Sequence, residues 1–159
     1  MTRCWIQRDT YASLVHEADR AFPNETGGVL VGYRSDNGEL VIHKMVGPGP
    51  NATHSSVRFT PDHIWQCEQL DRLYFESSKS WMYVGDWHTH PHGVPELSWL
   101  DRRTLRGIAK HSQAYTSSPV MMIGGGNIQH WDWKIHEYSG DRLFGLLITT
   151  NQRDLIPFD

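Results

Sequence analysis

Two histidines and one aspartate in the middle of the chain have the side-chain chemistry of zinc ligands. His88 and His90 are two residues apart, and Asp101 follows in the next predicted element. Residues two apart on a β-strand point to the same face of the sheet, so both imidazoles would lie on one side of it. Zinc held by two histidines and a carboxylate, with its fourth position left to water, is characteristic of catalytic rather than structural sites.

A strand and a helix must position these three side chains. The segment 81–90 is rich in aromatic and β-branched residues, which predicts a strand. Pro91 would end this strand because proline cannot donate to the ladder. Ser98 has the residue type of a helix N-cap, which places Asp101 in the first helical turn. A strand end and a helix start that face each other would supply three corners of a tetrahedron.

Each piece also has an ordinary explanation when it is taken alone. An H-x-H sequence occurs in common strands, and S-x-x-D is close to a simple capping box. The whole string is more specific, because H-T-H is followed by seven residues that begin with Pro91 and then by S-x-x-D. It resembles the zinc motif of the JAMM (MPN-plus) metalloproteases, and every fixed position of that motif is present.

This resemblance implies roles for five residues. His88, His90 and Asp101 would hold one Zn²⁺ per chain. Glu25, in P-N-E-T-G-G-V-L-V-G, matches the upstream glutamate that serves the family as general base and then as general acid. Ser98 matches the serine that donates a hydrogen bond to the oxyanion. Without the resemblance, Glu25 would be a solvated carboxylate at a helix end, and Ser98 would be only a cap.

Length and composition predict one soluble domain that covers residues 1–159. Hydrophobic residues make up 38% of the chain, and the net charge of −3 gives no basic footprint for nucleic acid. No apolar run approaches the ~20 residues of a membrane span, and the N-terminus lacks the apolar core of a signal peptide. We therefore expect a cytoplasmic protein with no membrane or nucleic-acid partner. Cys4 and Cys67 form no C-x-x-C pair, which argues against a thiolate metal site and against the zinc nucleobase deaminases.

The order of predicted elements favours a layered α/β fold with a mixed sheet. Apolar residues that recur with a helical period predict helices at 9–22, 60–76 and 98–111. The expected strands are 29–33, 40–46, 81–90, 119–123, 128–138 and 142–150, with turns at 124–127 and 139–141. The resemblance further implies a JAMM/MPN-type fold, with a curved sheet flanked by about three helices in a cytidine-deaminase-like arrangement.

The resemblance is closest to the short bacterial JAMM proteins of antiphage operons (CBASS-like), which are encoded beside ubiquitin-activating and ubiquitin-conjugating enzyme homologues. The runs that carry it are E-T-G-G-V-L-V-G-Y, G-P-G-P-x-A-x-H-S and G-D-W-H-T-H-P. The implied activity is a zinc isopeptidase that cleaves after the C-terminal residue of a ubiquitin-like or conjugated protein, reversing conjugation or processing a precursor. A nucleotidyltransferase of the same operon is one candidate target.

Two other functions are also compatible with the sequence. One is a different hydrolase, because JAMM proteins also release cysteine from a sulfur-carrier protein and occur among DNA-repair-associated relatives. The other is a non-catalytic MPN scaffold, a class that typically lacks the ligands present here. Neighbouring genes would separate the hydrolases, since conjugation enzymes favour an isopeptidase and cysteine synthesis genes favour the sulfur-carrier role.

The remaining histidines have no evident ligand partners in the sequence. Six of them fall on helical or strand patterns and are interpreted as structural or surface residues, and His92 is expected to be exposed. His54 stays open, because it lies in the long loop 47–56. That loop and the turn 91–97 are the expected walls of a channel that holds the substrate extended. The six histidines interpreted as structural or surface residues are His16, His43, His63, His111, His130 and His136.

Overall fold

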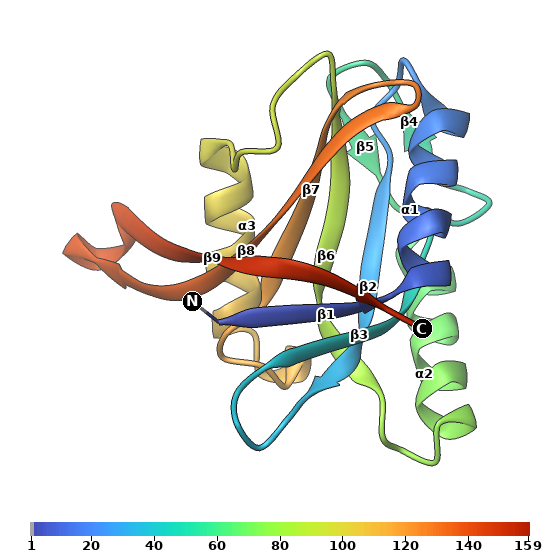
Figure 1. Ribbon diagram of the computed structural model, residues 1–159. Helices are drawn as coiled ribbons and strands as arrows, with labels where there is room; N and C mark the ends of the chain where they lie inside the picture. The colour runs from blue at the N-terminus through green and yellow to red at the C-terminus, as the bar shows by residue number, and fades with distance from the viewer. Residues whose placement is uncertain (1) are drawn as a thin grey trace.

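A seven-stranded barrel with three α-helices and a short hairpin makes up residues 2–159, the part of the chain that the computed structural model describes (Figure 1). In chain order the elements are β1 (Arg3–Gln7), α1 (Arg8–Ala21), β2 (Gly27–Arg34), β3 (Leu40–Val46), β4 (Thr53–His54), β5 (Phe59–Thr60), α2 (His63–Glu76), β6 (Met82–Pro91), α3 (Trp99–Lys110), β7 (Val120–Asn127), β8 (His130–Arg142) and β9 (Leu147–Phe158). Single 3₁₀ turns follow α3 (Ser112–Ala114) and β8 (Leu143–Gly145).

The barrel strands follow the order β1-β3-β2-β6-β7-β8-β9. The barrel closes because β1 pairs in parallel with β3 on one side and with β9 on the other. Strands β6 and β7 are also parallel, whereas β2 pairs antiparallel with both β3 and β6, and β8 pairs antiparallel with β7 and β9. The mixed sheet and the three helices expected from the sequence are therefore confirmed. Strand β1 was not expected.

Both faces of the central strands are covered, which explains their nearly continuous apolar sequences. Along β7, Val120 and Met122 belong to the cluster inside the barrel, whereas Met121 and Ile123 pack outward with Leu105 of α3. The same alternation in β2 turns Leu30 inward and Val29 and Val31 outward, toward Leu73 of α2. Strands β2, β6 and β7 thus form a wall between an apolar interior and two helices outside.

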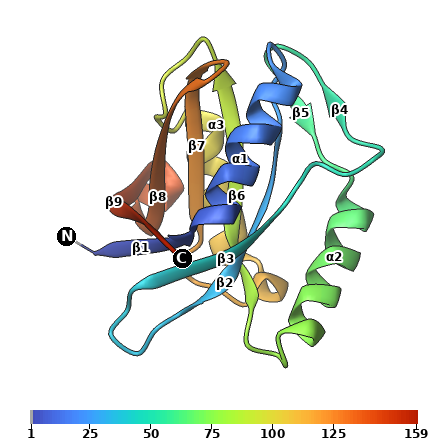
Figure 2. The ribbon, with the colours of Figure 1, turned by 45° about the vertical axis from the view of Figure 1, so that its right-hand side comes forward.

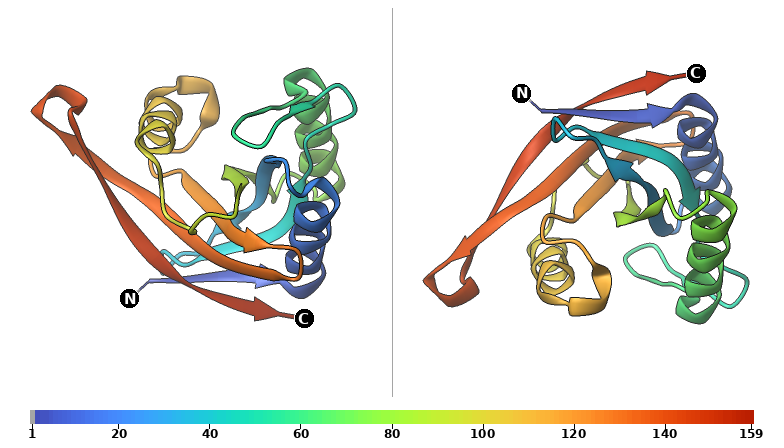
Figure 3. Two further views of the ribbon diagram at one scale, coloured as in Figure 1. Left: turned by 90° about the horizontal axis from the view of Figure 1, so that it is seen from above. Right: turned by 90° about the horizontal axis from the view of Figure 1, so that it is seen from below.

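The helices lie on different sides of this wall. Leu14 and Ala18 of α1 join the interior cluster, so α1 covers the inner side of the barrel. Helices α1 and α3 lie on opposite faces of the sheet (Figure 2). Seen from above, α3 lies on one side of β6, and α2 with the β4–β5 hairpin lies on the other (Figure 3). The outer face of β6 is consequently left between two helical walls.

The glycine run at 124–126 is part of a strand, and the prediction of a turn there is wrong. These residues continue β7 and pair with both β6 and β8. Glycine is required because other chain segments lie directly against the strand: a Cβ on Gly124 would meet the ring of Trp133 at 2.7 Å, and one on Gly125 would meet the carbonyl carbon of Val94 at 2.4 Å. The glycines thus mark close packing rather than a change of direction.

The last two strands are longer than expected, and the turn between them lies further along the chain. Gly140 lies within β8, at a register shift between Tyr138 and Gly140, so S-G-D at 139–141 is an irregularity in a strand rather than a turn. Asp141 is held by ion pairs with Arg106 and Lys110 of α3. The chain reverses at Leu143–Gly145, and β8 and β9 project from the barrel as an arm (Figure 1).

Helix starts agree with the sequence in one case of three. Helix α3 begins after the N-cap Ser98, as predicted. Helix α2 is capped by Asp62, whose side chain accepts from the Trp65 N–H, and not by Thr60. Helix α1 begins after Gln7, so Asp9 lies inside its first turn. None of the helices within residues 2–159 has the length and apolar character needed to cross a bilayer.

Replacing Gly125 by alanine should destabilise the fold. The added methyl group would lie 2.4–2.5 Å from the backbone of Val94 and Pro95, which cannot rotate away, and overpacking of this kind costs about 1–3 kcal/mol. The matched control is Gly107→Ala in α3, where no atom lies within 4 Å of the new Cβ and alanine should gain roughly 0.5–1 kcal/mol. Urea unfolding midpoints would compare the two variants. A Gly125→Ala protein as stable as the wild type would contradict the packing argument.

Candidate metal centre

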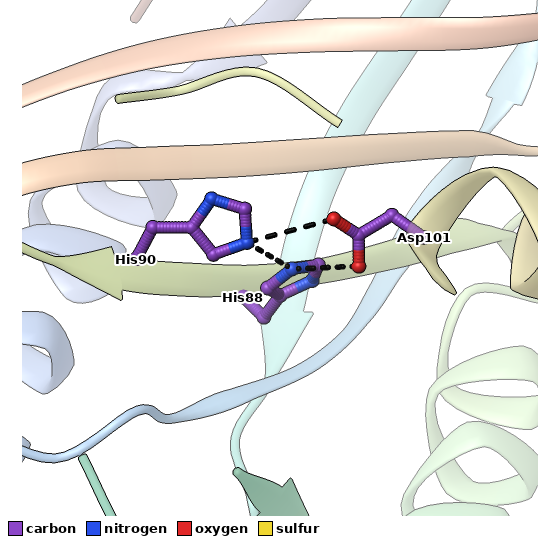
Figure 4. Close-up of side chains that lie close together, drawn as sticks. All are labelled: His88, His90 and Asp101. Carbon is purple, nitrogen blue, oxygen red and sulfur yellow. Dashed lines mark hydrogen bonds and ion pairs between the residues drawn. The ribbon is translucent and has the colours of Figure 1, made fainter. Parts of the chain in front are cut away.

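Three ligand-type side chains converge on the outer face of β6, above its carboxyl end (Figure 4). His88 Nε2 lies 3.0 Å from His90 Nε2 and 3.2 Å from Asp101 Oδ1. His90 Nε2 lies 3.5 Å from Asp101 Oδ2. Among residues 2–159, no other group of three or more histidine, cysteine, aspartate or glutamate side chains meets in this way. The structure thus brings together the three residues proposed as ligands from the sequence.

The donor atoms fit a small tetrahedral cation. Ligands about 2.0–2.1 Å from a zinc ion are roughly 3.3 Å from each other along the edges of the tetrahedron, and the three measured separations fall on both sides of that value. Two imidazole nitrogens 3.0 Å apart also cannot both carry a proton. The Nε2 atoms of the two histidines and the Asp101 carboxylate are directed toward one another, so all three could coordinate a single ion between them (Figure 4). Their nitrogen and oxygen chemistry suits zinc.

The strand orients the histidines by its pleat and by its neighbours. His90 Nδ1 lies 3.2 Å from the Val94 carbonyl, which can accept its proton and leave Nε2 free as the ligand atom. Gly27 pairs with His88 across the β2–β6 ladder. A Cβ on Gly27 would lie 2.8 Å from the His88 Cβ, so the glycine after E-T makes room for the imidazole.

Asp101 is fixed by a capping box at the start of α3. Its Oδ2 accepts the Ser98 N–H at 2.7 Å, while its own N–H donates to Ser98 Oγ at 3.1 Å. Burial raises the pKa of Asp101, but hydrogen bonds from His88, His90 and Ser98 outweigh it and hold the pKa well below its usual range. In turn, the hydrogen bond to Asp101 raises the pKa of His90 against the opposing effect of burial. Asp101 is therefore ionised and ready to bind a cation.

Glu25 shares a cleft with His88 and Asp101, so the sequence-predicted base lies at the same site. Burial raises the pKa of Glu25, and the nearby Asp101 adds to this effect, whereas His88 and His90 oppose it. A raised pKa makes a carboxyl easier to protonate, as a group that first accepts and then returns a proton requires.

Thr89 lies between His88 and His90 and is hydrogen-bonded to Thr26, the residue after Glu25. Its side chain points inward and is fully buried. The Thr26 N–H donates to Thr89 Oγ1 at 3.1 Å, and the Thr89 N–H donates to the Thr26 carbonyl at 2.9 Å. The residue that follows Glu25 is therefore fixed to the strand that carries the ligands.

His54 also contacts Glu25, and the sequence alone did not reveal this role. Its Nδ1 lies 2.8 Å from the Glu25 carbonyl oxygen, and the Glu25 N–H donates to the Ser55 carbonyl at 2.8 Å. Both backbone groups of Glu25 are thus held by the β4–β5 segment. The H-S pair in G-P-G-P-x-A-x-H-S was the available signal, but only the fold shows what it contacts.

A cleft of about 1300 Å³ extends from the metal centre along the outer face of β6. Its walls are α2, α3 and residues 57–61, and no residue of 47–56 or 91–97 lines it within the described chain. The two segments expected as channel walls therefore do not line this cleft. The 91–97 turn instead packs onto the barrel, where the Pro95 carbonyl accepts a hydrogen bond from His136 at 2.9 Å. Ser98 and Trp99 are exposed beside the ligands, and Arg103 stacks on Trp99.

Comparison with known proteins gives a consistent set of relatives. The family described as prokaryotic homologs of the JAB domain matches residues 7–136. A probable metalloprotease of Sinorhizobium fredii is 38% identical over 128 residues, which cover 80% of this chain and 78% of that protein. A CD-NTase/cGAS isopeptidase of Enterobacter hormaechei is 33% identical over 124 residues, which cover 77% of this chain and 67% of that protein. A solution structure of a Desulfitobacterium hafniense protein, 18% identical, superposes with a TM-score of 0.70 over 98% of this chain and 93% of its own, and supports the fold.

We expect the purified protein to bind zinc and the His88→Ala variant to lose it. Removing a residue that only orients a metal ligand typically weakens metal binding by roughly 10–100-fold. Removing a ligand itself should weaken zinc binding by more than this. Isothermal titration with zinc and elemental analysis after dialysis would measure the change. His92→Ala is the matched control, because His92 is exposed and its ring contacts Phe22 rather than the ligands. Equal zinc content in both variants would exclude His88 as a ligand.

Proposed function

Because the chain belongs to the family of prokaryotic homologs of the JAB domain, we propose that it is a zinc-dependent peptidase or isopeptidase. The match of the chain to this family confirms the resemblance to JAMM proteins that the sequence motifs indicated. The proposed reaction cleaves the amide bond after the C-terminal residue of a ubiquitin-like or otherwise conjugated protein. Such cleavage would reverse conjugation or trim a precursor. The relatives named as a metalloprotease and as CD-NTase/cGAS isopeptidases support this choice.

The observation that carries the proposal is a cluster of three ligand-type side chains beside a cleft that Glu25 also lines. His88, His90 and Asp101 offer a ligand set with a fourth position for water, and Glu25 lines the same cleft with a raised pKa. The ligands come from β6 and α3, and the carboxylate comes from the segment before β2. A non-catalytic scaffold would need none of these features, which argues against that alternative.

A zinc ion bound there would supply a Lewis acid and lower the pKa of water at the site. Glu25 would accept the proton of the water that attacks the scissile carbonyl carbon. When the carbon–nitrogen bond breaks, Glu25 would return that proton to the departing amine, so the products are a free amine and a carboxylic acid, which then ionises in solution. Because Ser98 Oγ accepts from the Asp101 N–H, its own hydrogen remains free to donate to the developing oxyanion.

The biological setting is part of the proposal, and the names of the CD-NTase/cGAS isopeptidase relatives support it. A ubiquitin-like protein or a nucleotidyltransferase conjugated through its C-terminus would be the substrate, in a bacterial antiphage system with activating and conjugating enzyme homologues encoded nearby. We propose a cytoplasmic location, a single domain over residues 1–159, and no nucleic-acid or membrane partner. In the alternative function, the same zinc ligands and Glu25 would release cysteine from the C-terminal tail of a sulfur-carrier protein.

The Glu25→Gln variant should keep its zinc and lose hydrolysis. General acid–base catalysis contributes about 10²–10⁴-fold, and the loss should reach the upper part of this range because one residue serves both proton transfers. Turnover of a C-terminal conjugate would be measured together with zinc content and unfolding temperature. Glu68→Gln, an exposed change on α2, is the control. A Glu25→Gln rate above a tenth of the wild-type value would remove Glu25 from the mechanism.

Ser98 has two roles that substitutions can separate. Ser98→Ala should lose about 1 kcal/mol of stability through the cap and roughly 10²–10³-fold in turnover through the oxyanion donor. Ser98→Asp should keep the cap, since aspartate is as good an N-cap as serine, but it should not recover the rate because an ionised carboxylate donates no hydrogen bond. Unfolding curves and kcat would be compared for both variants. Full activity of Ser98→Asp would leave serine with the cap alone.

A further inference from the structure

Asp86 places a carboxylate on the floor of the cleft, apart from the four groups of the metal centre. It lies two residues before His88 on β6, so the pleat turns it to the same outer face. It lines the cleft together with Glu25 and His88. At about 3.3–3.4 Å per residue, its place on the strand is roughly 7 Å from that of His88.

Asp86 lacks the cationic partner that comparable carboxylates have in this protein. Glu137 pairs with Arg34 and Arg153, and Asp141 pairs with Arg106 and Lys110. In residues 2–159, no lysine or arginine lies within ion-pair distance of Asp86. Its one recorded contact is the Tyr83 hydroxyl, which donates to Oδ1 at 2.8 Å. Asp86 is half-buried, and its Oδ2 has no hydrogen bond within the described chain, although carboxylates removed from water are usually paired.

The surroundings of Asp86 suit a long cationic side chain. The cleft walls carry apolar groups from both helices, among them Leu70 of α2 and Ile108 of α3. Asp71 of α2 adds a second carboxylate to the cleft lining. Arg58, which also lines the cleft, belongs to the β4–β5 hairpin. A lysine or arginine could rest its methylene groups on such walls and direct its charged head to a carboxylate on the floor.

We propose that Asp86, held by Tyr83, is a specificity subsite that binds the lysine or arginine side chain of a substrate about two residues from the cut bond. The spacing follows because residues two apart in an extended peptide are separated by about the same 7 Å as the positions of Asp86 and His88 on their strand. The inference rests on the proposed function, since it takes the metal centre as the place of cleavage. The basic residue belongs either to the tail on the carbonyl side or to the peptide around the acceptor lysine.

Binding measurements test the subsite without turnover. The probes are glycine–serine peptides that carry one arginine at successive positions, each matched with a peptide that has citrulline there. The zinc-loaded Glu25→Gln protein should bind one arginine peptide about 10-fold more tightly than its citrulline partner, as expected for a charge-assisted hydrogen bond. Adding Asp86→Asn should remove the difference, whereas adding Asp71→Asn, the matched cleft control, should keep it.

A second variant and a substrate comparison complete the test. Tyr83→Phe removes the hydroxyl but leaves the carboxylate, and it should reduce the discrimination in part, so the subsite stays testable if Asp86→Asn unfolds. With wild-type protein, isopeptides that carry arginine on the carbonyl side or on the amine side would show by kcat/KM which part of the substrate binds. Hydrolysis without any preference for arginine in binding or in kcat/KM would overturn the subsite. Preference in binding without hydrolysis of any isopeptide would instead refute the proposed function.

Discussion

The pleat of β6 is the constraint on which the metal centre depends. Trp87 and Thr89 point into the barrel, where both are almost completely buried, and their packing fixes the register of the strand. His88 and His90 must then face outward into the gap between α2 and α3. A slip of one residue would exchange the two sets, so the same packing that stabilises the interior also keeps both imidazoles on the outer face, beside Asp101.

The groups proposed for catalysis come from distant parts of the chain and are joined by hydrogen bonds rather than by sequence proximity. The Thr89–Thr26 pair fixes the segment after Glu25 to β6, and His54 and Ser55 hold Glu25 itself from the other side. On α3, the Ser98–Asp101 box sets both the first helical turn and the carboxylate ligand. Each polar contact that shapes the backbone here also orients a group that could take part in the reaction, and this leaves little freedom in the relative positions of base and ligands.

Sequence predicted the elements that carry a strong local signal. The H-x-H strand and the Ser98 cap depend on neighbours a few residues away, and the structure contains both. The glycine run was misassigned because the reason for it, the backbone of Val94 and Pro95 lying against Gly125, comes from a different part of the chain. The cleft walls and the contact of His54 with Glu25 are likewise products of tertiary packing. Motif resemblance predicted the three side chains that the structure brings together, but it could not predict what surrounds them.

The first and last strands of the barrel are hydrogen-bonded to each other, from Arg3 opposite Asp154 to Gln7 opposite Phe158. During synthesis on a ribosome, β1 leaves the exit tunnel before the other barrel strands, and this edge is paired only after β9 has emerged. Contacts of such long sequence separation are closed late and slow the folding of a domain. Until β9 emerges, the nascent chain exposes an unpaired strand edge, of the kind that invites pairing with other chains. The closure that removes edges from the finished barrel therefore makes its assembly vulnerable.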